Sequence, residues 1–287
     1  MAQAPVAVGG GGPPAGFGPS PQAMAEHQRE VDAASALPTP RAKDGHPDLT
    51  GYWGHRQNLG GLVEQAKSRV NPDGTTNAPL FGDIQDEINQ VKRGEANRAA
   101  REVNNGTRPV YKPEFQAQAL KNMRDSIHLD PAYRCQELGV PRLGPPSEIV
   151  QQPDIMFFLY SDVYPALPNH YRIVYTDGRQ HDPKADPMPN GDAIGHWEGD
   201  TLVIDITNID PDTWIDSQGS YHDDKLHVIE RYTRKGNALH YEVTVEDPTM
   251  FAQPFHPRPT DLLLGKPGEH VAQDYPCSEM DQSHYVN

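Results

Sequence analysis

Two pairs of alternating segments, each joined by a short glycine turn, constrain this fold more than any other feature of the sequence. Residues 194–197 and 201–207 flank Glu198-Gly199-Asp200, and residues 227–233 and 239–246 flank Lys235-Gly236-Asn237. In these segments apolar residues recur at every second position, which is the period of a half-buried strand. The sequence therefore predicts two β-hairpins.

Further strands are predicted upstream of the hairpins. Residues 155–160 form a continuous apolar run, and residues 171–175 alternate before the turn Asp177-Gly178. Successive strands without intervening helices favour an antiparallel meander. Because the edges of so long a sheet need cover, we expect a mainly β fold, a curled sheet or small barrel that is lipocalin-like in outline.

The N-terminal part is long, irregular and partly helical by the same criteria. Of 287 residues, 29 are proline and 25 are glycine, which is typical of a chain with many turns. We expect a flexible Pro/Gly-rich arm over residues 1–45 and a single β-rich domain over 46–287, with a helical insertion at about 83–125. Local structure is predicted as a helix at about 22–34, a short strand within 47–53, and helices at about 83–104 and 113–125.

Charge and composition narrow the classes of partner. The net charge is -15, so a nucleic acid would be repelled, and no apolar run reaches the ~20 residues that span a bilayer. Residues 1–5, Met-Ala-Gln-Ala-Pro, look like the mature end left by signal-peptide cleavage, which favours a periplasmic or secreted protein over an ordinary cytoplasmic start. Cys135 and Cys277 then either close a disulfide loop worth about 4–5 kcal/mol or stay as buried thiols.

Ionisable residues gather where strand pairing does not require them. They lie in residues 177–183, in the hairpin turn at 195–200, and in a connection over 208–226. Connections this long are uncommon in compact domains and are often functional. We expect the last of them to fold across an open end of the sheet, where a barrel would bind a ligand.

These residue types suit proton transfer. We predict His181 and His222 as catalytic acid and base, with Asp177 or Asp223 orienting them, because a histidine beside a carboxylate can move a proton near neutral pH. The predicted substrate-binding residues are Arg179, Arg231, Trp197, Trp214 and His227.

Plainer interpretations apply to several of these residues. Asp177 also suits a simple turn, and Glu198 and Asp200 also suit a solvated hairpin tip. The strand face that carries His227 and Arg231 could line a polar lumen or lie on the surface.

No cofactor is expected. The chain contains no Gly-x-Ser-x-Gly, Walker or dinucleotide motif and no Cys-x-x-Cys-His. Metal binding stays a minor alternative, since His181, His222, His227 and the aspartates of 208–226 lack the spacing of zinc or EF-hand sites.

Several strings, with the patterns DGRxH, IGxWEGDTLVxD and LHVxER among them, occur together between residues 45 and 280. They are Pro47–Trp53, Cys135 with Gly139–Arg142, Tyr175–His181, Ile194–Asp205, Leu226–Arg231 and Asp247-Pro248. Through them the chain resembles a large group of exported bacterial proteins, which implies export and one domain. It departs from that group between Gln180 and Asp192, which implies an unusual substrate if this segment borders the site.

The leading hypothesis is an extracytoplasmic lyase or isomerase that performs cofactor-independent acid–base chemistry (elimination, isomerisation or cyclisation) on a small organic molecule. The alternative is a barrel-type binding protein for a hydrophobic ligand, with a lumen lined by Phe157, Tyr160 and Tyr241 and its histidines facing solvent. A metal-assisted hydrolase is a further alternative. A homo-oligomer formed through the N-terminal arm is the expected protein partner.

Overall fold

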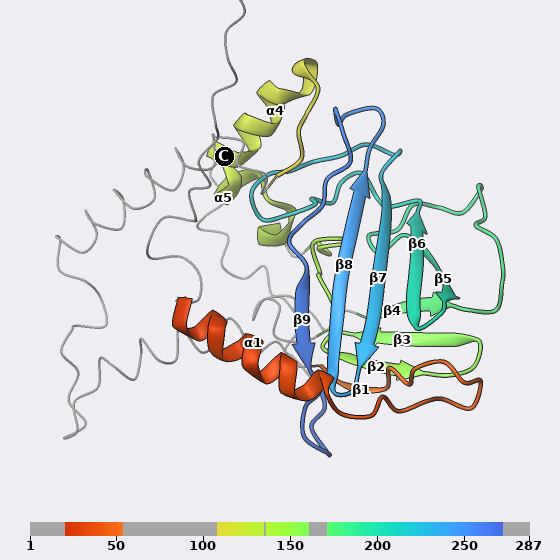
Figure 1. The fold of residues 1–287 in the computed structure, drawn as a ribbon. Coiled ribbons are helices and arrows are strands. Elements are labelled where there is room, and N and C mark those ends of the chain that lie inside the picture. The colour runs from red at the N-terminus through yellow and green to blue at the C-terminus, as the bar shows by residue number, and fades with distance from the viewer. Residues whose placement is uncertain (1–20, 54–107, 135, 161–170, 272–287) are drawn as a thin grey trace, which may run out of the picture.

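A single curled sheet dominates the structure, a computed structural model that describes residues 21–53, 108–134, 136–160 and 171–271. Its nine strands follow one another in the order β1 to β9 and form a half-barrel (Figure 1). The strands are β1 (Gly51–Tyr52), β2 (Glu148–Gln151), β3 (Ile155–Leu159), β4 (Tyr171–Tyr175), β5 (Asp192–Glu198), β6 (Thr201–Thr207), β7 (His227–Lys235), β8 (Ala238–Glu246) and β9 (Thr260–Leu263). The expectation of a mainly β fold with a curled sheet is confirmed.

Helices lie outside the sheet in the described ranges. They are α1 (Pro21–Ser35), α4 (Pro113–Arg124), the short α5 (Ser126–Leu129) and the 3₁₀ turn η1 (Pro131–Arg134). The helices predicted at about 22–34 and 113–125 are confirmed as α1 and α4, and Pro113 occupies the first turn of α4 as proline can at that position. The helix predicted at 83–104 and both cysteines lie outside the described residues.

One junction in the sheet differs from the predicted antiparallel meander. Strand β4 contacts β5 in parallel through Tyr175 and Ile194, whereas every other neighbouring pair is antiparallel. A parallel pair needs a connection long enough to return the chain to the starting end of the strand. Residues 176–191 provide that connection, and the turn predicted at Asp177-Gly178 begins it, with Gly178 at φ 79°.

The two faces of the sheet differ sharply in burial. On β6 the side chains of Leu202, Ile204 and Ile206 are fully buried, whereas Asp205 on the opposite face is partly exposed. Burying an aliphatic side chain of this size stabilises the fold by about 1.5–3 kcal/mol. The buried face, which is concave and holds the hydrophobic core, is called the inner face below.

The two edge strands approach each other. The backbone N–H of Gly265, just past β9, donates a hydrogen bond to the carbonyl of Tyr52 in β1 at 2.7 Å. The space between them is tight, because a Cβ added at Gly51 would lie 2.5 Å from Leu264 Cδ1.

Helix α1 lies against the end of the β7–β8 hairpin and along β9 (Figure 1). The Asn237 N–H donates to the Ala34 carbonyl at 3.0 Å, and the Gly236 N–H donates to Thr39 Oγ1 at 2.8 Å. Residues 21–39 therefore contact the sheet, while the predicted division into an arm to residue 45 and a domain from 46 stays a prediction. Within the described ranges, no helix has the length and apolar character needed to cross a membrane.

Candidate functional site

A chain of alternating histidines and carboxylates crosses the outer face of the sheet. We name it the His–carboxylate array and define it by Asp192, His181, Asp205, His227 and Glu246. Asp205 Oδ1 lies 3.0 Å from His181 Nε2 and 3.1 Å from His227 Nε2. The second nitrogen of each ring faces another carboxylate, with His181 Nδ1 2.9 Å from Asp192 Oδ2 and His227 Nδ1 3.3 Å from Glu246 Oε2.

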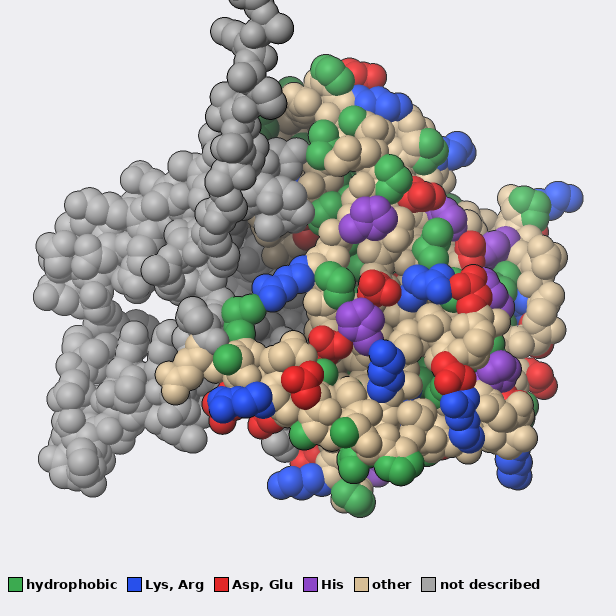
Figure 2. All heavy atoms as spheres, viewed as in Figure 1, with side chains coloured by type: hydrophobic (Ala, Val, Ile, Leu, Met, Phe, Trp, Pro, Cys, Tyr) green, Lys and Arg blue, Asp and Glu red, His purple; other side chains and the backbone are tan. Residues whose placement is uncertain are grey.

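Strand register brings most of the array together. His227 and Glu246 are directly opposite each other in the β7–β8 hairpin, and Asp205 lies on β6 beside β7. Alternation along each strand turns these side chains away from the core. His181 comes instead from the connection between β4 and β5. Figure 2 shows histidine and carboxylate side chains interspersed on the face that these strands present to solvent.

The geometry fixes what each histidine can do. A ring nitrogen next to a carboxylate oxygen is suited to donate a hydrogen bond to it. All four of these hydrogen bonds form together only when each ring carries protons on both nitrogens. The exposed fractions of the side chains range from 24% for Asp192 to 41% for Asp205. The array is therefore open to a small molecule and partly shielded from water.

Apolar side chains border the array. Asp205 is paired across the sheet with Ile194 of β5 and Ile229 of β7, and Val203 precedes it by two positions on the same face. Val203 is only 4% exposed, whereas both isoleucines are partly exposed. An organic molecule in contact with the histidines would therefore also meet hydrocarbon.

Asp177 and Arg179 lie together in the connection from β4. Arg179 Nε is 2.9 Å from Asp177 Oδ1 and its Nη2 is 2.7 Å from Oδ2. The guanidinium lies 3.5 Å above the centre of the Tyr175 ring. Hydrogen bonds to Arg179 hold the pKa of the Asp177 carboxyl below its ordinary value. The carboxylates that contact His181 are those of Asp192 and Asp205.

Arg231 and Trp197 lie near the β5–β6 hairpin. Arg231 Nη2 donates to Glu198 Oε2 at 2.7 Å, and the Trp197 ring stacks on His46 with the ring centres 4.7 Å apart. The Arg231 side chain is 38% exposed, so the strand face it shares with His227 is a surface strip and does not line a lumen. At the hairpin tip Asp200 pairs with Arg41.

His222 has a different environment from His181. It is 4% exposed, its Nε2 is 3.0 Å from Thr213 Oγ1, and its Nδ1 donates to the Asp223 carbonyl at 2.8 Å. Burial lowers the pKa of His222, and the Asp223 carbonyl and the charge of Asp247 only partly oppose this. In the described residues no hydrogen bond or ion pair joins His222 to His181.

The other predicted residues of the 208–226 connection belong to the same packed segment. Trp214 is 7% exposed, and Asp223 Oδ1 accepts the Lys225 N–H at 2.7 Å. The connection is fixed to α4 at Gly219, where an added Cβ would lie 2.6 Å from the Met123 nitrogen. The catalytic roles predicted for His222, Asp177 and Asp223 stay predictions.

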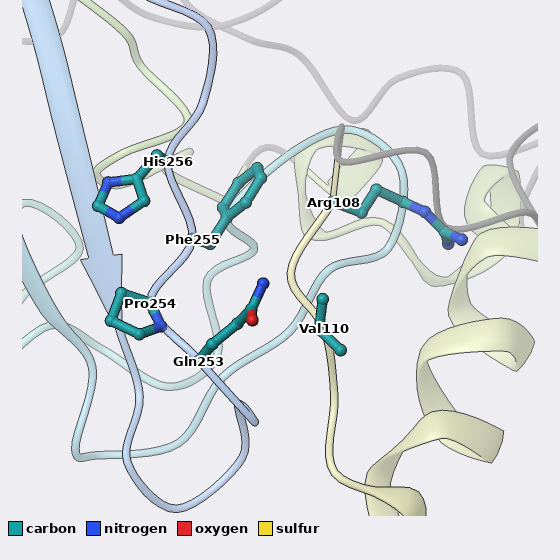
Figure 3. Close-up of a pocket in the computed structure, with 6 residues that line it drawn as sticks. All are labelled: Arg108, Val110, Gln253, Pro254, Phe255 and His256. Carbon is teal, nitrogen blue, oxygen red and sulfur yellow. The ribbon is translucent and has the colours of Figure 1, made fainter. Parts of the chain in front are cut away.

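A surface pocket of about 190 Å³ lies elsewhere, between residues 108–110 and 253–256. Figure 3 shows Arg108 and His256 on opposite sides of it, with Gln253 between them. His256 Nδ1 lies 3.2 Å from Thr244 Oγ1. None of the residues predicted for chemistry lines this pocket.

Asp192, Asp205 and Glu246 were not predicted as site residues. Asp205 and Glu246 occupy outward positions of strands whose alternation is visible in the sequence. Pairing the two β7–β8 segments in register would have placed Glu246 against His227. The position of Asp192 beside His181 depends on the course of residues 182–191, for which the sequence offers no comparable signal.

Comparison of the chain with protein-family models, with curated proteins and with solved structures finds no match. In the described residues, no group of three or more His, Cys, Asp and Glu side chains converges in a way that could hold a metal ion. The members of the His–carboxylate array contact one another in a row and do not surround a common point.

Proposed function

We propose that the protein is an extracytoplasmic enzyme that moves protons on a small organic molecule at the His–carboxylate array. The observation that supports this most is the shared acceptor, Asp205 Oδ1, which lies within 3.1 Å of a nitrogen of both His181 and His227. Two histidines oriented by one carboxylate provide an acid and a base side by side.

The chemistry follows from this pairing. Both nitrogens of each ring contact carboxylates, so a substrate first takes the place of Asp192 at His181 Nδ1 or of Glu246 at His227 Nδ1. The ring that then faces the substrate in its neutral form takes a proton from a carbon or oxygen, and the other ring in its charged form returns a proton at a second position. Asp205 holds the two nitrogens, and the carboxylates of Asp192 and Glu246 compensate the charge that appears on each ring. Elimination, isomerisation and cyclisation need only these transfers.

Neighbouring residues supply contacts for a substrate. Ile194 and Ile229 offer hydrocarbon beside Asp205, and Arg231, paired with Glu198, lies further along β7. The segment in which this chain departs from the group it resembles runs from Gln180 to Asp192. It begins beside His181 of the shared DGRxH string and its other end contributes Asp192 to the array, which supports a substrate different from that of the group.

Hydrogen exchange at carbon tests the proposal before the substrate is known. The protein is incubated in D₂O with a panel of small ketones, hydroxy acids and unsaturated acids, and deuterium incorporation is followed by NMR and mass spectrometry. We expect wild-type protein to label at least one compound. His181→Gln and His227→Gln should each lower that rate by about a hundredfold or more.

A matched control comes from the same face of the sheet. His240 Nδ1 lies 2.7 Å from Asp261 Oδ1 and its Nε2 lies 3.7 Å from Glu242 Oε1, but His240 is not part of the array. His240→Gln should leave the rate within about twofold. Absence of wild-type labelling across the panel, or equal rates in all three variants, would overturn the proposal.

A binding protein without chemistry is the second candidate. Its support is the position of Tyr160 and Tyr241 on the inner face, while His181 and His227 lie on the outer face. Phe157 lies on the opposite side of β3 from the buried Phe158, which takes the inner position instead. This candidate requires a lipocalin-like barrel with a closed lumen. The hydrogen bond from the Gly265 N–H to the Tyr52 carbonyl supports such closure.

Two further proposals rest on sequence. Export to the periplasm or beyond is supported by the resemblance and by the composition of residues 1–5. Metal-assisted hydrolysis is the third candidate, and assays of ester and amide hydrolysis on chelator-treated protein with and without added zinc test it.

A further inference from the structure

A polar cluster lies inside the hydrophobic core, on the face of the sheet opposite the array. We name it the interior polar cluster and define it by Arg172, Glu230, Tyr160, Tyr232 and Tyr241. None of these residues is more than 4% exposed. They come from β4, β7, β8 and the residue that follows β3, so the curl of the sheet brings them together.

Part of the cluster is internally bonded. The Arg172 Nη2 group donates to Glu230 Oε2, and the Tyr241 hydroxyl donates to Glu230 Oε1 at 3.1 Å. The Arg172 guanidinium also lies 5.1 Å from the centre of the Phe158 ring. These contacts satisfy the carboxylate and compensate its charge.

Among the described residues, other polar atoms of the cluster have no hydrogen-bond partner of normal geometry, although the Tyr160 hydroxyl lies close to the Arg172 guanidinium. They are Nε and Nη1 of Arg172 and the hydroxyl oxygens of Tyr160 and Tyr232. Buried polar groups are almost always paired, and an unpaired one costs about 1–3 kcal/mol. So many orphaned atoms in one place indicate that they bond to something outside the described residues.

The chemistry of these atoms defines what would satisfy them. Guanidinium nitrogens only donate, and a phenol can donate to an oxygen, so the missing group is an oxygen acceptor. The charge of Arg172 is already balanced by Glu230. A second anion would leave a net negative charge in the core, which favours an uncharged ligand. The Phe158 and Tyr232 rings, 5.4 Å apart and edge to face, offer it an apolar, aromatic surface.

We propose that the interior polar cluster binds a small uncharged organic molecule through a carbonyl oxygen, which accepts from Arg172, Tyr160 and Tyr232. The proposal rests on the inner face alone and does not depend on chemistry at the array. It adds a second ligand site, separated from the array by the thickness of the sheet.

A matched pair of probe compounds tests whether the ligand needs a carbonyl oxygen. Acetophenone and isopropylbenzene have the same skeleton of heavy atoms, but only acetophenone carries a carbonyl, and benzoate adds a negative charge. Full-length protein is equilibrated with each compound, and affinity is measured by ligand-observed NMR and by the shift in thermal midpoint. We expect acetophenone to bind at least about tenfold more tightly than isopropylbenzene or benzoate.

Variants that remove only the orphaned hydroxyl groups test whether the ligand binds at the interior polar cluster. Tyr160→Phe/Tyr232→Phe should lower the affinity for acetophenone by about tenfold or more with little change in the thermal midpoint, since neither hydroxyl has a hydrogen bond of normal geometry to the described residues. Substituting Arg172 is less informative because Glu230 would be left buried and unpaired. His227→Gln on the outer face should leave acetophenone binding unchanged, which separates this result from the test of the array.

Several results would overturn the proposal. Equal binding of acetophenone and isopropylbenzene would remove the role of the oxygen. Wild-type affinity in the double variant would place the ligand elsewhere, and tighter binding of benzoate would contradict the uncharged class. Failure of acetophenone to bind at all would indicate that water alone occupies the cluster.

Discussion

His222 illustrates at the scale of one residue how burial sets charge in this protein. Its pKa lies below the ordinary value of 6.5, chiefly because burial disfavours the charged ring. In the unfolded chain the same ring binds a proton at higher pH. Below about pH 6.5 the unfolded state therefore binds more protons than the folded state, and the free energy of unfolding falls as pH falls.

We predict that His222→Gln weakens this dependence on acid. The measurement is the free energy of unfolding in urea at about pH 7.5 and about pH 5.5, on either side of the ordinary histidine pKa. Wild-type protein should lose more stability between the two values than the variant does. His196→Gln, whose ring is 57% exposed, is the control and should behave as the wild type. An equal loss in His222→Gln and wild type would contradict a neutral buried His222.

At the same scale, the sequence predicts which face of a strand a side chain occupies more readily than which residues that side chain contacts. Position in a strand places His227 and Arg231 on one face, and both do lie on the partly exposed side. Whether that face is a lumen or a surface depends on which way the whole sheet curls. The partners of His181 depend on the path of a connection without regular structure, for which alternation has no meaning.

At the scale of elements, the two hairpin turns form a natural comparison. Gly199 and Gly236 each begin a turn between paired strands, with φ values of 61° and 55°. An added Cβ at Gly199 meets nothing within 4 Å. At Gly236 it would lie 2.2 Å from the Ala34 carbonyl oxygen, because the end of α1 covers that turn. The two sites share the same backbone strain and differ in the contact with the helix.

We therefore predict that Gly236→Ala destabilises the protein more than Gly199→Ala. Backbone strain should cost each variant about 1–2 kcal/mol of unfolding free energy. Displacing residues 34–37 should cost Gly236→Ala about 1–3 kcal/mol more. Urea unfolding of both variants measures the difference. Equal losses would show that α1 does not rest on the hairpin in solution.

Sequence alternation predicts elements better than it predicts their pairing. The strand at 201–207 is found with the bounds expected, whereas β2 and β9, of four residues each, were not predicted. The inward position of Arg172 could not be read, because alternation makes Tyr171, Ile173 and Tyr175 the more apolar face of β4, whereas Arg172 lies on the buried face with Val174. That Glu230 would meet it from β7 could not be read, because the contact needs the curl of the sheet.

At the scale of the whole molecule, the question is whether the half-barrel closes. The bond from the Gly265 N–H to the Tyr52 carbonyl joins the two edges of the sheet. Edge strands with unpaired backbone groups invite pairing with other chains, and joining the edges removes that exposure. Closure would also isolate the interior polar cluster from water. The contact between the two edges, called the seam below, therefore determines whether a ligand can enter between them.

Amide hydrogen exchange measures the seam directly. We predict that the Gly265 amide of wild-type protein exchanges at least about a hundredfold more slowly than an unstructured amide. Gly51→Ala should lower that protection, because it strains the backbone of β1 at φ 144° and makes the Leu264 side chain, 2.5 Å from the added Cβ, move out of the space between the edges. The Ile204 amide, in the central strand β6, should keep its protection in the same variant. If instead the wild-type Gly265 amide exchanges as quickly as an unstructured one, the edges are apart in solution and the sheet is an open half-barrel, with its interior reached from the seam.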